Sequence, residues 1–245
     1  MTDKWLLVLG AKSDIARATA ERFAFHGFNL LLAARKCHLL DDTAREYEKR
    51  YGVQAKSIEF DVLDFGSHPG FYSGLGENVC GVLCAVGYVG AQNRSGLGFE
   101  ETRRIIDVNF TGCVSILDVV AADFEKRKGG FIIGISSVAG DRGRSSNYHY
   151  GSAKAAFTAY LSGLRNRLFT SGVFIMTVKP GFVATSMTRN LDLPPLLVSQ
   201  PSDVADDIFR AWKRRRDVIY TKWFWKYIMI ILAVVPEKLF KRLSI

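Results

Sequence analysis

Two side chains of this 245-residue sequence have the types and the spacing needed to move a proton. Tyr150 is the only one of nine tyrosines with a lysine four residues further on, Lys154. Residues i and i+4 share one face of a helix, so the phenol and the ammonium could point into one cleft. A nearby ammonium favours the ionised phenol, which makes the phenol a usable proton donor and acceptor near neutral pH. By spacing alone, such a pair is also typical of an exposed helix surface.

A hydroxyl precedes this helix at the end of a predicted strand. Ser137 follows the apolar run Phe131–Ile135 and stands thirteen residues before Tyr150. Ligands of open parallel sheets bind at the carboxyl ends of the strands. We therefore expect the Ser137 hydroxyl to lie beside Tyr150 and to hold the oxygen of a substrate.

A turn near the N-terminus could bind phosphate. The apolar run Trp5–Leu9 leads into Gly10 and then into a helical pattern that begins near Ile15. At such a junction the backbone N–H groups around Ser13 and Ile15, together with the positive end of the helix, point at an anion. Gly10 is the only glycine kept from the usual dinucleotide-binding turn, and Asp14 occupies one of the later positions. A nucleotide site and an ordinary turn capped by Asp14 both remain open.

The ends of the next two strands indicate which nucleotide would bind. The second strand ends in Ala34-Arg35-Lys36, where NAD-selective folds usually present a carboxylate. Arg35 could instead bind a 2′-phosphate, which favours NADP(H) over NAD(H); a solvated basic loop is the alternative. The third strand closes on Asp61-Val62, where a carboxylate can accept from an adenine amino group or can simply start a helix.

Strand-like apolar runs alternate with helical stretches along most of the chain. This alternation is typical of a parallel sheet covered on both faces, so we expect an α/β fold with a Rossmann-type doubly wound sheet. The expected strands are 5–9, 29–33, 55–60, 79–86, 131–135 and 173–178, and the expected helices are 15–25, 39–51, 100–124 and 152–169. We predict a single domain over residues 1–210 that holds both sites, followed by a basic, apolar C-terminal segment over 211–245.

The net charge of +9 is concentrated in that segment. Residues 210–245 hold ten Lys or Arg against Asp217 and Glu237, so they carry +8 and the other 209 residues carry +1. The four cysteines have no CxxC or metal-ligand spacing, and the N-terminus does not look like a signal peptide. We therefore expect a cytoplasmic protein with reduced thiols and no metal.

The C-terminal segment has the composition of an interfacial helix. Tyr227–Val235 is an unbroken apolar run of nine residues behind Trp223-Phe224-Trp225, with lysines and arginines on both sides. The run is too short to cross a bilayer alone, but aromatic residues beside basic ones suit an anionic membrane surface, to which Arg214–Arg216 could add. Burial in a homo-oligomer or against the substrate pocket is the alternative. Nucleic-acid binding is not expected, because the charge adjoins an apolar run.

Taken together, these motifs resemble the short-chain dehydrogenase/reductase family over residues 4 to about 190. The most specific parts are the Ser137-to-Tyr150 step and the run Tyr150-Gly151-Ser152-Ala153-Lys154, supported by Asn109 and by Pro180-Gly181-Phe182-Val183-Ala184-Thr185. The resemblance implies a Rossmann fold that binds NAD(P)(H) and interconverts a carbonyl and an alcohol, in a family that often oligomerises.

The resemblance also implies a role for each matching residue. Tyr150 would be the general acid/base, Ser137 the partner of the carbonyl oxygen, and Lys154 the holder of the nicotinamide ribose. Asn109 would anchor a water in the proton relay. The cofactor-binding positions would be Gly10, Ser13, Ile15, Arg35, Asp61, Val62, Gly87, Tyr150, Lys154, Pro180, Val183 and Thr185. The sequence departs from the family at Cys84-Ala85-Val86-Gly87, where asparagines that normally brace the sheet are missing.

A second, partial resemblance concerns the substrate. Tyr227-Ile228-Met229, Pro236 and Phe240-Lys241-Arg242-Leu243, together with Ala139-Gly140-Asp141-Arg142, are similar to the decaprenylphosphoryl 2-keto-erythro-pentose reductases within that family. This resemblance implies a ketosugar on a polyprenyl phosphate, reached from the inner face of the cell membrane. The alternatives are a soluble ketone, a 3-ketoacyl thioester, or a non-catalytic protein that senses a dinucleotide.

Overall fold

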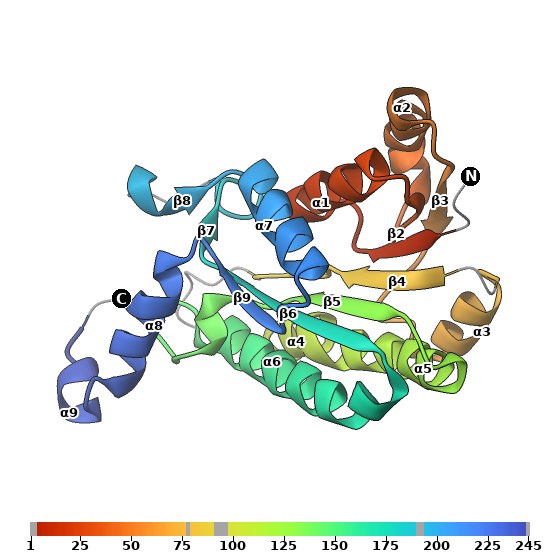
Figure 1. The fold of residues 1–245 in the computed structure, drawn as a ribbon. Coiled ribbons are helices and arrows are strands. Elements are labelled where there is room, and N and C mark those ends of the chain that lie inside the picture. The colour runs from red at the N-terminus through yellow and green to blue at the C-terminus, as the bar shows by residue number, and fades with distance from the viewer. Residues whose placement is uncertain (1–3, 77–78, 91–97, 190–193, 244–245) are drawn as a thin grey trace.

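The computed structural model describes residues 4–76, 79–90, 98–189 and 194–243. A seven-stranded parallel sheet forms the centre of the molecule (Figure 1). The strands lie in the order β3-β2-β1-β4-β5-β6-β9, and every neighbouring pair runs parallel. The order reverses between β1 and β4, and ligands of such sheets bind beside that point. The strands are β1 (Trp5–Leu9), β2 (Asn29–Ala34), β3 (Ala55–Glu59), β4 (Val79–Cys84), β5 (Phe131–Ile135), β6 (Phe174–Pro180) and β9 (Val218–Thr221). The predicted Rossmann-type doubly wound α/β fold is confirmed.

One face of the sheet is covered by α1 (Asp14–Phe25), α2 (Asp41–Tyr51) and α7 (Pro201–Lys213) (Figure 1). Aromatic rings pack α1 against the sheet and against α7. Phe23 of α1 stacks on Phe131 of β5 with ring centres 5.9 Å apart, and it packs edge to face on Phe209 of α7 at 5.1 Å. Because both faces of the sheet are covered, β1, β2, β5 and β6 are buried along their whole length, which explains why their sequences are mostly apolar.

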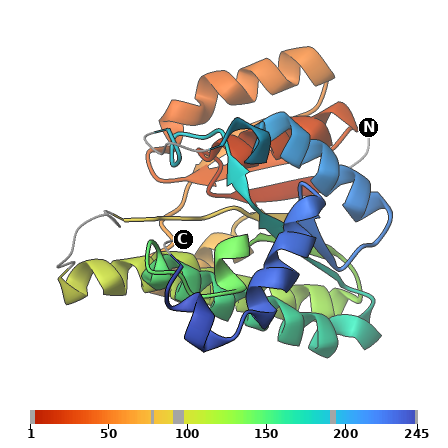
Figure 2. The ribbon, with the colours of Figure 1, turned by 90° about the vertical axis from the view of Figure 1, so that its left-hand side faces the viewer.

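The other face is covered by α3 (His68–Ser73), α4 (Phe99–Ile106), α5 (Gly112–Arg127) and α6 (Tyr148–Leu168) (Figure 2). The helix expected over 100–124 is present, but a π-helical turn, η3 (Asp107–Thr111), separates α4 from α5. By length and composition alone, Phe99–Arg127 is also long and apolar enough to cross a membrane. Its inner side chains, including Ile116, Leu117 and Val120, are instead completely buried in the core with β1 and β4, so it is a core helix here.

Short elements complete the chain, and several of them lie at the carboxyl edge of the sheet. They are the helical turns η1 (Cys37–Leu40), η2 (Phe65–Ser67), η4 (Val138–Gly140), η5 (Phe169–Ser171) and η6 (Pro195–Leu197), the paired strands β7 (Phe182–Val183) and β8 (Val198–Ser199), and the helices α8 (Phe224–Val234) and α9 (Glu237–Phe240). Sequence periodicity did not predict α3, β7, β8 or β9, because these elements have six residues or fewer. The prediction also lacked α7, although its apolar residues stand at helical spacing.

The predicted domain boundary after residue 210 is wrong. It falls inside α7, and the last strand of the central sheet, β9, lies beyond it and pairs with β6 from Thr177↔Val218 to Pro180↔Thr221. Residues 211–221 therefore belong to the domain, since their removal would take away a sheet edge. The helices α8 and α9, which follow β9, project from the body on the left in Figure 1.

Candidate active site

The three residues expected to react are brought to one place. Ser137, Tyr150 and Lys154 line a single cavity of about 90 Å³ at the carboxyl ends of the strands. A second cavity of about 340 Å³ adjoins it, and the two cavities share several lining residues, among them Ser13 and Ile15. Together the two cavities run from the reacting side chains to the predicted nucleotide-binding turn.

The chain brings Ser137 to α6 through a close backbone contact. Ser137 is extended, with φ at −167°, and its Oγ accepts from the Ala139 backbone N–H at 3.1 Å. This bond leaves the hydroxyl hydrogen available for a substrate oxygen. Gly140 then lies against α6 so closely that a Cβ there would stand 2.7 Å from the Ala155 nitrogen. A side chain at residue 140 would therefore push the Ser137 turn away from the helix that carries Tyr150.

Lys154 is fixed by backbone carbonyls on two neighbouring strand ends. It is only 2% exposed, and its Nζ donates to Val86 O at 3.2 Å and to Ile135 O at 3.0 Å. An ammonium has three N–H donors, so one remains for the cavity that Lys154 lines. Nζ also lies 5.8 Å from the centre of the Tyr150 ring, so the ammonium lies beside the phenol ring.

Asn109 lies in the π-helical turn and braces the segment after β4. Its amide is completely buried; Nδ2 donates to Tyr88 O at 2.6 Å and to Ile105 O at 2.8 Å, and Oδ1 accepts from Tyr88 N at 3.1 Å. π-Helical turns are frequent at functional sites because they displace one side chain from the helical pattern. Asn109 does not line either cavity, and its role in holding a relay water stays a prediction.

These contacts also explain how the sheet does without the missing asparagines at 84–87. The Val86 carbonyl binds Lys154, and the Ala85 N–H binds Leu9 O at 2.9 Å, so backbone groups brace this strand end. The space above Gly87 is bordered by Asn109 Oδ1 and Lys154 Nζ, which would lie 3.6 and 4.0 Å from a Cβ at that position. Gly87 thus leaves the floor of the cleft open beside the buried ammonium.

The nucleotide end of the cleft is built around the turn after β1. Gly10 has φ at +79°, and a Cβ there would meet the Val86 nitrogen at 2.9 Å, so the turn requires glycine. Ser13 precedes the first residue of α1 in an extended conformation and makes no capping bond with its side chain. The first backbone N–H groups of the twelve-residue α1 therefore point toward the cavity that Ser13 and Ile15 line, as an anion requires.

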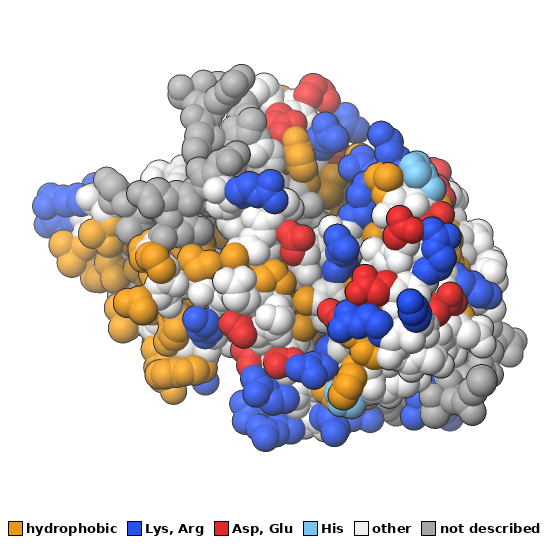
Figure 3. Space-filling view, turned by 90° about the horizontal axis from the view of Figure 1, so that it is seen from above, with side chains coloured by type: hydrophobic (Ala, Val, Ile, Leu, Met, Phe, Trp, Pro, Cys, Tyr) orange, Lys and Arg blue, Asp and Glu red, His pale blue; other side chains and the backbone are white. Residues whose placement is uncertain are grey.

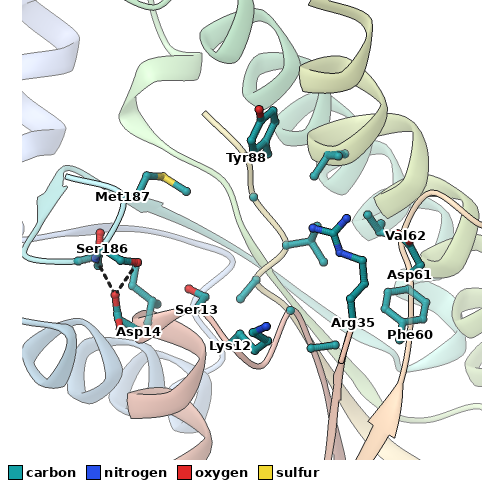
Figure 4. Close-up of a pocket in the computed structure, with 18 of the residues that line it drawn as sticks. Lys12, Ser13, Asp14, Arg35, Phe60, Asp61, Val62, Tyr88, Ser186 and Met187 are labelled. Atoms are coloured by element: carbon teal, nitrogen blue, oxygen red, sulfur yellow. Dashed lines mark hydrogen bonds between the residues drawn. The ribbon is translucent and has the colours of Figure 1, made fainter. Parts of the chain in front are cut away.

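Two cations extend over this end of the larger cavity. Arg35, at the end of β2, and Lys12, in the Gly10 turn, both line it and are exposed, and Asp61 and Val62 line the facing wall (Figure 4). Lys12 was not singled out from the sequence, because one lysine in a turn is not informative. Neither cation has an ion-pair partner among the described residues.

The carboxylate of Glu59 lies near Arg35, but it accepts hydrogen bonds from the backbone of the next two residues. Glu59, the last residue of β3, accepts from the N–H groups of Lys36 at 2.8 Å and Cys37 at 2.9 Å. These two bonds lower the pKa of the Glu59 carboxyl. Both carboxylate oxygens are thus occupied in holding the loop after Arg35, and neither is presented to a ribose.

Asp14 has a different task from the helix cap expected of it. Its Oδ2 accepts from the backbone N–H of Ser186 at 2.9 Å and from the Ser186 hydroxyl at 3.3 Å (Figure 4). This contact ties the loop after Thr185 to the start of α1. Pro180, Val183 and Thr185, predicted as cofactor contacts, line the smaller cavity beneath that loop. No spacing rule links residues 172 positions apart, so the sequence did not reveal the contact.

The described part of the chain holds no group of three His, Cys, Asp or Glu side chains that could bind a metal ion. The four cysteines are free thiols, and two of them, Cys84 and Cys113, are completely buried near Lys154.

Comparison with known proteins identifies relatives of this arrangement. Residues 4–194 match the family model described as short chain dehydrogenase. The chain is 31% identical over 241 residues to an uncharacterized oxidoreductase of Mycobacterium tuberculosis, covering 97% of this chain and 96% of the relative. It is also 31% identical over 191 residues to the very-long-chain 3-oxoacyl-CoA reductase-A of Danio rerio, covering 76% of this chain and 60% of that protein. A short-chain dehydrogenase from Sphingobium yanoikuyae in complex with NADPH has the same fold, with a TM-score of 0.82, 23% identity, and coverage of 96% and 97%.

Proposed function

Because the chain belongs to the short-chain dehydrogenase family, whose members are oxidoreductases acting on alcohol and ketone pairs, we propose that it uses NADP(H) to reduce a ketone to a secondary alcohol. One observation carries the proposal: Ser137, Tyr150 and Lys154 line the same small cavity, and this cavity adjoins a larger one that reaches the Gly10 turn. A nicotinamide cofactor has an extended shape with a phosphate centre, which fits the two adjoining cavities and the helix N-terminus between them.

The residues of the small cavity divide the work of the reduction. The chemistry that the cofactor supplies is a hydride for the carbonyl carbon. The Ser137 hydroxyl donates to the carbonyl oxygen and orients it, and Tyr150 gives that oxygen its proton. The Lys154 ammonium, held by Val86 O and Ile135 O, stabilises the phenolate left on Tyr150 and uses its third N–H for the nicotinamide ribose. We propose that Asn109 keeps the segment around Tyr88 in place and anchors the water that returns a proton to the site.

The choice of NADP(H) over NAD(H) is part of the proposal. Arg35 and Lys12 both reach the nucleotide cavity, and two cations with free N–H groups suit a 2′-phosphate. Glu59 is occupied by the backbone of residues 36 and 37, so it does not compete for the ribose hydroxyls. Asp61 lines the part of the cavity where an adenine amino group would lie.

For the substrate, we propose a ketosugar carried on a polyprenyl phosphate. Arg144 supports a phosphate-bearing substrate: it lies in the loop between Ser137 and Tyr150, its buried Nε has no hydrogen-bond partner, and it forms no ion pair with a described residue. Burial without a counter-charge lowers the pKa of this guanidinium, and a buried cation is stabilised by an anion. For such a substrate we propose that the enzyme is cytoplasmic and peripheral on the inner face of the cell membrane, in a homo-oligomer.

Two alternatives to the reduction of a lipid-linked ketosugar are reduction of another ketone and dinucleotide sensing without catalysis. A soluble ketone or a 3-ketoacyl thioester would use the same reacting residues, and the Danio rerio relative is named for a 3-oxoacyl substrate. A dinucleotide sensor would bind NADPH without consuming it.

The experiment mixes the enzyme with NADPH and, separately, a polyprenyl-phosphate 2-ketosugar, a 3-ketoacyl thioester and the soluble diketone 1-phenyl-1,2-propanedione. We expect one NADPH to be oxidised for each ketone reduced, with the highest kcat/KM for the phosphate-linked sugar. A higher kcat/KM for the thioester than for the sugar would show that a 3-ketoacyl thioester, and not a polyprenyl-phosphate ketosugar, is the preferred substrate. NADPH binding without oxidation by any of the three would identify a sensor.

A further inference from the structure

The C-terminal end of the chain packs against the elements that carry the reacting residues. Strand β9 ends at Thr221, which pairs with Pro180 on the carboxyl edge of the sheet, so residues 222–243, the C-terminal hairpin, begin at the edge where the small cavity lies. Figure 2 shows this end of the chain in dark blue. Trp225 and Met229 of α8 are buried and pack on Val138, the residue after Ser137. Trp225 also covers Gly181, where a Cβ would lie only 2.0 Å from the indole Nε1. The inner face of the hairpin therefore packs behind residues that border the small cavity, such as Gly181.

An arginine from the loop after Ser137 fixes the far end of the hairpin. Arg142 donates from Nη1 to Ala233 O at 2.9 Å and from Nη2 to Val235 O at 3.3 Å, and it pairs with Glu237 at 2.8 Å. Its guanidinium lies 4.1 Å from the centre of the Phe240 ring. These bonds satisfy carbonyls at the C-terminal end of α8, which have no partner inside the helix. The hairpin is thus held rigidly against the loop that carries Ser137.

The outer face of α8 is apolar and open to solvent. Its large side chains follow one helical stripe and are exposed by 73% at Trp223, 57% at Tyr227, 63% at Ile231 and 74% at Val234. Leu239 of α9 extends the stripe at 56%. Figure 3 shows hydrophobic side chains gathered on the side of the molecule where α8 and α9 project. A contiguous apolar surface of this kind is typical of an interaction site.

Cations surround this stripe. Lys226, Lys238, Lys241 and Arg242 are exposed, and none of them has an ion-pair partner among the described residues. The hairpin's only acidic side chain, Glu237, is already paired with Arg142. Apolar and aromatic side chains with unpaired cations beside them match the boundary between acyl chains and anionic headgroups.

The basic run at Arg214–Arg216 is not part of this surface. Those residues follow α7 and precede β9, so they lie at the amino edge of the sheet. The Arg215 guanidinium is 5.3 Å from the ring of Phe174, the first residue of β6. The expectation that this run adds to membrane attraction at the hairpin is therefore wrong. The charge of the C-terminal region is divided between two opposite edges of the molecule.

We propose that the outer face of the C-terminal hairpin docks on an anionic lipid bilayer and holds the mouth of the reacting cavity at the headgroup level. The proposal rests on the proposed function, because a polyprenyl-phosphate substrate keeps its isoprenoid in the bilayer. The cations favour anionic lipid over a second copy of this chain, whose identical face carries the same positive charge.

The first test measures binding to vesicles of 30% phosphatidylglycerol and 70% phosphatidylcholine by flotation of the full chain. The variant Ile231→Asp/Val234→Asp changes two exposed residues, and its matched control is Phe169→Asp, a residue 80% exposed on η5. We expect the double variant to lose at least about 30-fold in vesicle partitioning and the control to bind like the wild type. Unchanged thermal unfolding shows that both variants are folded.

The second test separates the two basic regions. Lys226→Gln/Lys238→Gln/Lys241→Gln is compared with Arg214→Gln/Arg215→Gln/Arg216→Gln, which removes the same number of charges. Each cation near an anionic surface contributes about fivefold, so we expect roughly 100-fold weaker binding for the lysine variant and little change for the arginine variant. Equal losses in both variants would contradict the docking face.

The proposal is overturned if the wild type does not bind these vesicles, or if the Asp double variant binds them as well as the wild type. It is also overturned if that variant changes a dimer to a monomer while vesicle binding is absent, since the face would then join two copies. Reduction of 1-phenyl-1,2-propanedione by the same variants is measured in parallel. Retained turnover with lost vesicle binding supports the docking face, whereas absent turnover in the wild type counts against the proposed reaction alone.

Discussion

The two ends of the cleft hold their functional side chains in different ways. At the reacting end, Lys154 and Asn109 are buried, and backbone groups on several elements fix them at 2.6–3.2 Å. At the nucleotide end, Arg35 and Lys12 are exposed and extend over a cavity, and it is the backbone beside them that is fixed, after Arg35 by Glu59 and around Lys12 by the Gly10 turn.

This difference shows what each end requires. Proton transfer depends on sub-ångström placement, so its residues are anchored by bonds that leave them few other conformations. Recognition of a charged phosphate tolerates a flexible cation, because a charge acts over a longer distance than a hydrogen bond. Substitutions at the reacting end should therefore abolish turnover or reduce stability, and those at the nucleotide end should change cofactor preference.

Removing the phenol hydroxyl should have the largest effect. In Tyr150→Phe we expect kcat to fall by at least about 100-fold, because a general acid of this kind contributes 10²–10⁴-fold. The dissociation constant for NADPH, measured by fluorescence titration, should change little. A variant that keeps more than about a tenth of the wild-type kcat would show that Tyr150 is not the proton donor.

Asn109→Ala tests the bracing at the reacting end. The change removes three hydrogen bonds and leaves the Tyr88 N–H and C=O without partners, so the free energy of unfolding should fall by about 1–3 kcal/mol. Urea denaturation measures this loss. Thr102→Ala, a change of a half-buried residue on α4, is the control and should alter stability by less than about 0.5 kcal/mol. Equal effects of the two changes would mean that the Asn109 bonds do not stabilise the fold.

Arg35→Asp tests the nucleotide end. Replacing a cation with a carboxylate removes charge-assisted hydrogen bonds to a 2′-phosphate and offers an acceptor to the ribose hydroxyls. We expect the ratio of kcat/KM for NADPH over NADH to fall by about 10- to 100-fold, with a folded protein and little change in kcat. An unaltered ratio would exclude Arg35 from cofactor selection.

The smallest effect concerns the loop beneath Arg35. The pKa of Glu59 is lowered in the folded protein by the N–H groups of Cys37 and Lys36, so the carboxylate adds stability above its ordinary pKa of 4.5 and loses it as the pH falls through the lower folded value. Glu59→Gln should therefore have a lower Tm than the wild type at pH 7. The gap should narrow below about pH 4.5, and a gap that is constant with pH would contradict the role of the charge.

Sequence reasoning predicted the parts of the molecule that follow local rules. The buried strands read as apolar runs, and the Tyr150–Lys154 spacing placed both side chains on one face of α6. Contacts between distant segments could not be read in this way. The Asp14–Ser186 bond joins residues 172 positions apart, and strand β9 is recognisable only through its pairing with β6.

The C-terminal region shows the same limit. Its composition indicated a basic, aromatic segment, but composition does not specify where in space the charges lie. The structure assigns Arg214–Arg216 and the hairpin to opposite edges of the sheet, because β9 passes between them.

The central claim is hydride transfer within one cleft, and isotope labelling tests it most directly. The enzyme is incubated with NADPH carrying deuterium at both C4 positions of the dihydronicotinamide and with 1-phenyl-1,2-propanedione, and the alcohol is analysed by mass spectrometry. We predict one deuterium on the carbon that was the carbonyl, and a greatly reduced yield with Tyr150→Phe. An alcohol formed without deuterium would contradict the account, as would the absence of alcohol from this diketone and from the two other ketones named above, the polyprenyl-phosphate 2-ketosugar and the 3-ketoacyl thioester.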